Sequence, residues 1–221
     1  MSGRDAGAAL CAPFLDHLPV TGLSVSVVSD SGSQSTVGTS DLIAARLDEL
    51  QFELGEGPTS DVLLLGRPVL TPDLADDRVR RDWPVFGVAA LGTGARALFS
   101  FPMLNGVFTV GVVSLYSVLP RPPWSDAEVR TATGLVRATT GPAVQLATRS
   151  ATDEARPTER LPAEMRREVH QASGMLMVQL DCSIAEATSR LRAYAFSRDR
   201  PIDMVARDVV TGMLDFRMVD D

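Results

Sequence analysis

The sequence predicts an α+β protein in two parts: a region of mixed strands and helices over residues 1–150 and a purely helical region over 163–217. Three observations support this division. Serine alternates with apolar residues over 23–28, an Asn-Gly pair separates two apolar runs at 105–106, and beyond residue 163 apolar residues recur only at helical spacing. Because the strands follow one another with few crossover helices between them, the sheet is expected to be antiparallel.

The first half of the mixed region contains a hairpin and a helix. Residues 23–28 and 34–39 read as two strands joined by a polar turn. Apolar residues at helical spacing over 41–50 predict a helix that has Ser40 or Asp41 as its N-cap.

The second half adds a short helix and three strands. A helix is expected over 59–65 and a strand over 67–70, which a Thr-Pro pair terminates. The apolar runs over 95–103 and 107–117 flank Leu104-Asn105-Gly106, and an Asn-Gly pair in that setting is a strong signal for a hairpin.

A long helix is expected to follow. Ser125 and Glu128 form a capping box, and the residues after it recur at steps of three and four over about three heptads. The members of this stripe are Val129, Ala132, Val136, Thr139, Ala143 and Leu146. The stripe is either the seam of a dimer or a face packed on the chain's own sheet, and Gly141-Pro142 would kink or interrupt the helix in both cases.

Residues 151–162 are polar, contain two prolines and are interpreted as a linker or a solvated helical spacer. Three helices are expected beyond it: one over 163–180, one that begins at Ser183 with Glu186 as capping-box partner, and one over 199–213. Their apolar stripes are Met165, Val169, Ala172, Leu176 and Leu180; Ile184, Ala187, Leu191 and Ala195; and Ile202, Val205, Ala206, Val209, Val210 and Met213. So small a bundle is expected to rely on the preceding helix or on a second subunit for stability.

Charge divides the chain at nearly the same place. The 221 residues include 21 basic residues, all of them arginine, against 28 acidic ones; residues 1–155 carry a net charge of −6 and residues 156–217 a net charge of +1. The overall acidity argues against nonspecific nucleic-acid binding by the whole surface. A local arginine-rich segment near the C-terminus is still able to contact phosphate.

Composition also excludes several classes of protein. An apolar fraction of 45% excludes disorder throughout, and the longest apolar run, over 107–119, is shorter than the roughly 20 residues that cross a bilayer. No leader peptide is recognisable, so the chain is expected to be cytoplasmic and to make no membrane contact. With two isolated cysteines, two histidines, no lysine and no nucleotide-binding or nucleophile motif, we expect no metal, no cofactor and no enzymatic activity.

The mixed region resembles a bacterial GAF domain over about residues 8–147. The segments that carry the resemblance are ELGEGPTSDVLLLGRPVLTPDL at 53–74, RRDWPVFGVAALGTGARALFSFPM at 80–103, the Asn-Gly hairpin, and WSDAEV at 124–129. The resemblance implies a six-stranded antiparallel sheet flanked by helices. It also implies a sensor of a small ligand or of a protein.

The helical region resembles the ANTAR domain, a three-helix RNA-binding module of transcription antiterminators. The pattern runs through residues 168–210 and includes Ala172-x-Gly174, Leu176-Met177, Cys182-Ser183, Glu186-Ala187, Leu191-Arg192, Ala195 and 202–206. The resemblance implies a homodimer that binds paired hairpin loops in nascent RNA. Two cationic positions of the family are absent, since this chain has Ser173 where lysine is usual and Asp199-Arg200-Pro201 where Asn-Arg-Lys is frequent.

Five residues are candidates for RNA contact: Arg190, Arg192, Tyr194, Arg198 and Arg200. Guanidinium groups interleaved with aromatic rings neutralise phosphates and stack on unpaired bases. The alternative for the arginines is ordinary surface charge, and the alternative for Tyr194 is a place in the bundle core.

A DNA-binding helix-turn-helix is the nearest rival for the last two helices. The outward face of the third helix is expected to present Asp203, Arg207, Asp208 and Asp215. Three carboxylates against one guanidinium would repel the phosphates that border the major groove, which disfavours DNA.

The GAF-like region offers weaker candidates. Glu53, Glu56 and Asp61 form either a carboxylate site or, as we favour, part of a loop with special backbone geometry. The glycines at 92–94 precede no helix signal and make a weak phosphate cradle, and Cys11 is expected to lie outside the sheet, away from any bound tetrapyrrole.

The most favoured function is that of a cytoplasmic, signal-responsive regulator that binds RNA hairpin loops and prevents transcription termination. The alternatives are a DNA-binding helical regulator or a protein-interaction adaptor with a GAF sensor. A signalling enzyme is less favoured, because no acid-base or nucleophile pair is recognisable.

Overall fold

The computed structural model describes residues 3–28, 34–152 and 161–218. The chain forms two compact units, one over residues 1–156 and the other over 157–221. The first unit has mixed α and β structure and the second is helical, which confirms the predicted α+β class.

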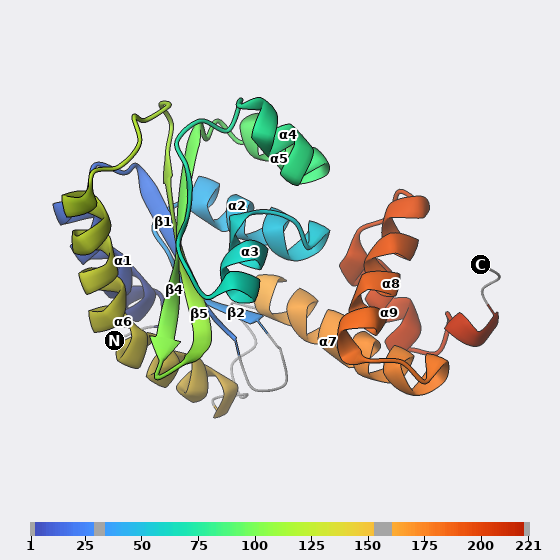
Figure 1. Ribbon diagram of the computed structural model, residues 1–221. Helices are drawn as coiled ribbons and strands as arrows, with labels where there is room; N and C mark the ends of the chain where they lie inside the picture. Colours follow the sequence, from blue (N-terminus) through green and yellow to red (C-terminus); the bar gives the residue numbers. More distant parts are fainter. Residues whose placement is uncertain (1–2, 29–33, 153–160, 219–221) are drawn as a thin grey trace. The chain divides into compact units, whose positions relative to one another are not determined.

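The first unit is built on an antiparallel sheet in the order β2-β1-β5-β4-β3 (Figure 1). Its strands are β1 (Gly22–Val28), β2 (Gln34–Thr39), β3 (Val69–Thr71), β4 (Ala97–Asn105) and β5 (Phe108–Ser117). Both predicted hairpins are present, β1 with β2 and β4 with β5. The described residues give five strands where the resemblance implied six.

Helices cover both faces of this sheet (Figure 1). On one face lie α1 (Gly3–His17) and α6 (Asp126–Thr152); on the other lie α2 (Leu42–Leu54), α3 (Pro58–Leu65), α4 (Asp77–Asp82) and α5 (Pro84–Gly92). Three of these helices, α1, α4 and α5, were not predicted from the sequence. Of these, α1 buries Cys11 and Phe14, whose spacing of three residues places them on one helix face, and Leu18 is buried just beyond its end.

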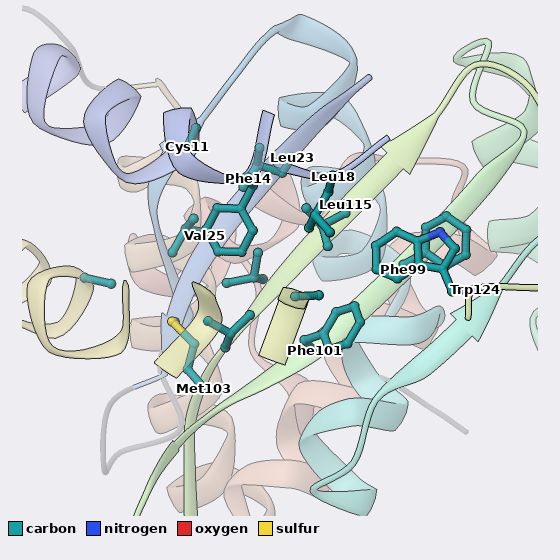
Figure 2. Packing of buried hydrophobic residues seen from close by; sticks show 14 of the residues in the cluster. Cys11, Phe14, Leu18, Leu23, Val25, Phe99, Phe101, Met103, Leu115 and Trp124 are labelled. Atoms are coloured by element: carbon teal, nitrogen blue, oxygen red, sulfur yellow. The ribbon is translucent and has the colours of Figure 1, made fainter. Parts of the chain in front are cut away.

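The larger core lies between the sheet and the α1 and α6 layer (Figure 2). Alternate residues of the strands point into it, including Leu23 and Val25 of β1. Trp124, just before α6, stacks on Phe99 with ring centroids 4.3 Å apart and lies 5.8 Å from Phe101. This aromatic group fixes the start of α6 against β4.

The apolar stripe of α6 faces this core. Ala132, Val136, Thr139 and Ala143 are buried, so the stripe packs on the chain's own sheet instead of on a second copy. The helix continues through Pro142, which lies on its exposed side. A homodimer therefore stays a prediction that this stripe does not support.

Local signals explain where the helices begin. Asp41 caps α2 by accepting a hydrogen bond from the Ala44 amide at 2.9 Å. The capping box before α6 is formed, since Glu128 Oε2 accepts from the Ser125 amide at 2.8 Å. The Ser125 hydroxyl and that amide lower the pKa of the Glu128 carboxyl. In the β4–β5 hairpin, Gly106 adopts φ 62°, a conformation that favours glycine.

The second unit contains α7 (Leu161–Leu180), α8 (Ile184–Ser197), α9 (Ile202–Val210) and a short 3₁₀ turn, η1 (Phe216–Met218). Buried Leu176 and Leu191 lie at its centre, and Ser183 caps α8 as predicted. Three expectations were wrong at the edges. Ile184 and Met213 are exposed, and Asp215 lies beyond the end of α9.

The predicted linker over 151–162 falls only partly on residues that the structure describes. Residues 151–152 still belong to α6 and 161–162 to α7, and residues 153–160 lie outside the described residues. In the part of the chain that the structure describes, no helix combines the length and the apolar character needed to cross a membrane.

Candidate nucleic-acid interface and sensor core

The five candidate residues lie on the second half of α8 and in the turn before α9. Arg190 and Arg198 are exposed, as a phosphate-binding role requires. Arg192 is only half-exposed, and burial lowers the pKa of its guanidinium. The helix turns Arg192 partly toward the interior, which leaves it less available to a phosphate than Arg190 or Arg198.

Tyr194 has two partners within the unit. Its ring centroid lies 5.1 Å from that of Phe216, and the Arg198 guanidinium carbon lies 5.4 Å from the Tyr194 centroid. An arginine at this distance from an aromatic ring makes a cation–π contact. Tyr194 is therefore partly a packing residue, while Arg198 stays at the surface.

The α8–α9 turn has the geometry of a Schellman motif. The Arg200 amide donates to the Ala195 carbonyl at 2.9 Å and the Asp199 amide donates to the Phe196 carbonyl at 3.1 Å. Asp199 occupies the left-handed position with φ 48°, where glycine or asparagine is more usual. The turn thus fixes the backbone that carries Arg198 and Arg200.

Arg200 is engaged by an acidic partner. Its Nη2 donates to Asp208 Oδ2 of α9 at 2.7 Å, and the two side chains are 38% and 19% exposed. This ion pair holds the cation against the bundle. Ser173 stands where the family usually has lysine. It is buried, and its hydroxyl lies 3.0 Å from that of Thr188, so this position also faces the interior of the bundle.

The charges of α9 do not suit DNA. Arg207, which the sequence placed on the outer face, is paired with Glu168 of α7 at 3.2 and 3.3 Å. Asp203 and Asp208 lie on the same helix. A recognition helix would have to bring these carboxylates to the walls of the groove.

In the first unit, the carboxylates of the LGEGP segment serve separate local roles. Glu56 Oε2 accepts from the amides of Val85 and Phe86 at 3.1 and 3.0 Å, which satisfies the N-terminus of α5. Glu53 pairs with Arg46 at 3.3 Å. Burial raises the pKa of the Asp61 carboxyl, partly offset by a hydrogen bond from a tryptophan. The three do not form a carboxylate site.

The glycines of that segment explain its conformation. Gly55 ends α2 in the left-handed region with φ 66°. Gly57 has φ 112°, and a Cβ there would lie 2.9 Å from Gln51 Cγ and 3.0 Å from Phe86 Cδ1. The favoured interpretation as a loop of special geometry is confirmed.

A row of serine hydroxyls crosses the sheet face beneath α2 and α3. Ser24, Ser114 and Ser100 are aligned on β1, β5 and β4 and are all buried. We call these three residues the hydroxyl row. The Ser100 and Ser114 hydroxyls are 2.8 Å apart, and the Thr59 hydroxyl of α3 lies 3.1 Å from that of Ser114.

Gln51 of α2 borders the hydroxyl row. Its Oε1 accepts from the Thr59 amide at 2.8 Å, whereas its buried Nε2 has no hydrogen-bond acceptor among the described residues. An unsatisfied buried donor is costly, so this amide has the capacity for one further acceptor. Nothing in the sequence pointed to this residue, because a glutamine within an amphipathic helix normally faces solvent.

Two other expectations for the first unit concern Cys11 and the glycines at 92–94. Cys11 is on α1, outside the sheet as expected, and burial with the nearby Asp41 charge raises its pKa to about 12. The thiol is thus protonated at neutral pH and unsuited to covalent chemistry. The glycines at 92–94 end α5 instead of beginning a helix, so they form no phosphate cradle.

Comparison with protein families agrees with this geometry. The model of the GAF domain matches residues 15–140, and the model of the ANTAR domain matches residues 162–210. A search of curated proteins found no match.

Solved structures resemble the first unit. The GAF domain of a phosphoenolpyruvate-protein phosphotransferase from Coxiella burnetii is 14% identical, with a TM-score of 0.51 over 68% of this chain and 87% of that one. A GAF domain/HD domain protein from Geobacter sulfurreducens is also 14% identical, with a TM-score of 0.50 over 66% of this chain and 95% of that one. At these identities the likeness shows the fold alone. The chain belongs to the GAF domain family and carries an ANTAR domain after its GAF domain.

Proposed function

We propose that this protein is a signal-responsive regulator whose ANTAR domain binds RNA hairpin loops in nascent transcripts and so prevents transcription termination. The GAF domain controls that binding. The proposed contacts come from Arg190, Arg198 and Arg200, with Tyr194 in a stacking role and Arg192 as a supporting residue of the bundle.

The observation that carries the proposal is the pair formed by Arg198 and Tyr194 at the end of α8. The guanidinium lies 5.4 Å from the ring centroid and is exposed, and Arg190 is exposed on the same helix. Cations beside an aromatic ring are the usual means of binding the phosphates and splayed bases of RNA loops. This favours RNA over DNA, because the α9 surface that would enter a DNA groove is acidic.

The first experiment is a pull-down of cellular RNA with the full chain, followed by sequencing. We expect enrichment of transcripts that contain two neighbouring hairpins. The affinity of the most enriched two-hairpin RNA is then measured for the Arg190, Arg198, Arg200→Ala triple variant.

A matched control removes three exposed arginines from the GAF domain, Arg78, Arg130 and Arg137. Each lost phosphate contact is expected to cost about 1–3 kcal/mol and to lower the slope of log affinity against log salt by about 0.7. The ANTAR triple variant should therefore bind far more weakly and with a slope lower by about 2, and the control should bind normally. Equal binding by the two triple variants would refute the proposed surface and favour a protein adaptor.

We propose a homodimer and no enzymatic activity. Light scattering should report two chains, and a monomer at tens of micromolar with and without RNA would contradict this. The purified protein should hydrolyse neither cyclic nucleotides nor phosphoesters. Turnover that disappears on a point substitution would overturn the non-enzyme assignment.

A small ligand is the favoured input of the GAF domain, because the Gln51 amide lacks an acceptor among the described residues beside the hydroxyl row. A thermal-shift screen should find a polar molecule that raises the melting temperature of the wild type. Ser100→Ala should reduce that shift, and Thr133→Ala, on the exposed side of α6, should retain it. A molecule that stabilises both variants equally binds elsewhere, and a screen with no hit favours a protein signal.

A further inference from the structure

The chain continues beyond the matched ANTAR domain into a segment that folds back on the bundle. The amides of Met213 and Leu214 both donate to the Asp208 carbonyl, at 2.8 and 3.0 Å, and η1 follows. The family match ends at residue 210, so this segment lies outside the matched residues. We call residues 213–218 the C-terminal strap.

Two further contacts hold the strap. The Phe216 amide donates to Gln179 Oε1 of α7 at 3.2 Å, and the Phe216 ring, only 8% exposed, packs against Tyr194 with centroids 5.1 Å apart and planes inclined by 58°. The only charged side chains of the strap, Asp215 and Arg217, pair with each other at 2.5 Å. The strap is thus attached by an aromatic contact and by three backbone amides, those of Met213, Leu214 and Phe216, and its side chains carry no net charge.

Tyr194 therefore already has the surroundings of an RNA-stacking residue. The apolar Phe216 ring packs against it, and the Arg198 guanidinium lies 5.4 Å from its centroid. In an RNA complex, a nucleobase would pack against Tyr194 in place of Phe216, and the guanidinium would bind a phosphate. In the free protein the Phe216 ring, inclined by 58°, obstructs the place that a stacked base would take.

We propose that the C-terminal strap is an autoinhibitory element: the tilted Phe216 ring covers part of Tyr194 and obstructs base stacking on it, and an unpaired RNA base displaces Phe216 on binding. This inference rests on the proposed RNA-binding function. Because the strap is neutral, it lowers affinity by occupying the ring and does not compete for phosphates, so its removal leaves the salt dependence unchanged.

The direct test is hydrogen exchange of the full wild-type chain with and without the most enriched two-hairpin RNA. Amides of residues 213–218 should exchange faster when RNA is bound, while those at the end of α8 become protected. Unchanged or slower exchange in the strap would overturn the proposal, because Phe216 would then be an ordinary core residue or part of the RNA contact.

Variants give a second test. Phe216→Ala should bind the RNA about tenfold more tightly, equivalent to about 1.4 kcal/mol, with an unchanged salt slope. Met218→Ala is the matched control, since Met218 is in the same strap but 83% exposed. In a Tyr194→Ala background the gain from Phe216→Ala should vanish.

Gln179→Ala serves if Phe216→Ala fails to fold. It removes the anchoring hydrogen bond and should tighten binding about threefold with the melting temperature little changed. If the wild type binds RNA and neither variant binds more tightly, the strap proposal fails and the proposed function stands. If neither the wild type nor any variant binds RNA, the proposed function fails and the inference falls with it.

Discussion

Asp208→Asn is expected to tighten RNA binding while it weakens the bundle. Asp208 holds the Arg200 guanidinium at 2.7 Å, so in the free protein this cation is partly neutralised before RNA arrives. Asparagine has the same size as aspartate and removes only the charge. Arg200 would then be available to a phosphate, and one source of repulsion near the RNA would be lost.

The structure sets the size of both effects. At 2.7 Å the Coulomb energy of the pair is about 1.5 kcal/mol in bulk water, but both side chains are partly solvated and exposed pairs measure about 0.2–1 kcal/mol. We therefore expect Asp208→Asn to lower the free energy of unfolding by about 1 kcal/mol or less. Freeing Arg200 should improve RNA binding by about 1 kcal/mol, or about fivefold, and steepen the salt slope by about 0.7.

The assay is fluorescence anisotropy with the enriched two-hairpin RNA over a series of salt concentrations. Asp203→Asn is the control, because it removes the same charge from the same helix without touching Arg200. In an Arg200→Ala background, Asp208→Asn should have no more effect than the control. Equal gains from Asp203→Asn and Asp208→Asn, or a gain that persists without Arg200, would refute the reasoning.

Three further predictions concern the scaffold. Gly57→Ala should lower the free energy of unfolding of the GAF domain by about 2–3 kcal/mol in chemical denaturation. The new Cβ would crowd Gln51 and Phe86, and the φ of this position strains any L residue. A loss under about 0.5 kcal/mol would show that the crowding is easily relieved. Asp199→Gly should raise the free energy of unfolding of the ANTAR domain by about 0.5–1 kcal/mol, because glycine relieves the strain of the left-handed conformation. Asp199→Ala should not raise it. Equal effects of the two substitutions would show that the backbone conformation is irrelevant. The Cys11 thiol, with its pKa raised to about 12, stays protonated in the folded chain while the unfolded chain ionises near 9, so stability should fall above pH 9 by up to about 1.4 kcal/mol per pH unit. The slope is compared between pH 9 and 10, because burial and Asp41 also raise the pKa of Tyr116 above its ordinary value of 10.0. An equally steep fall in Cys11→Ala would assign the effect to another group.

Local signals in the sequence predicted the elements whose causes are local. Asn105-Gly106 predicted the hairpin, and Ser125 and Ser183 predicted the starts of α6 and α8, because turns and caps depend on residues a few positions apart. The same reasoning missed α5, whose N-terminus is satisfied by Glu56, 29 and 30 residues earlier in the chain.

The candidate interface was limited in the same way. The five residues could be chosen from composition and resemblance, but their availability depends on partners far along the chain. Tyr194 meets Phe216 and Arg200 meets Asp208 only after the helices have packed. The partial burial of Arg192 depends on the orientation of α8 about its own axis. An apolar stripe in the sequence defines that orientation only to within about one residue.

The cap that Glu56 provides has a consequence for how the GAF domain opens. The carboxylate lies in the short loop between α2 and α3, yet it completes the first turn of α5. Fraying of that loop would expose the two amides of α5 at the same moment. We expect these three helices to lose protection as one cooperative foldon, so that a disturbance at the hydroxyl row reaches the opposite end of the helical layer in a single opening event.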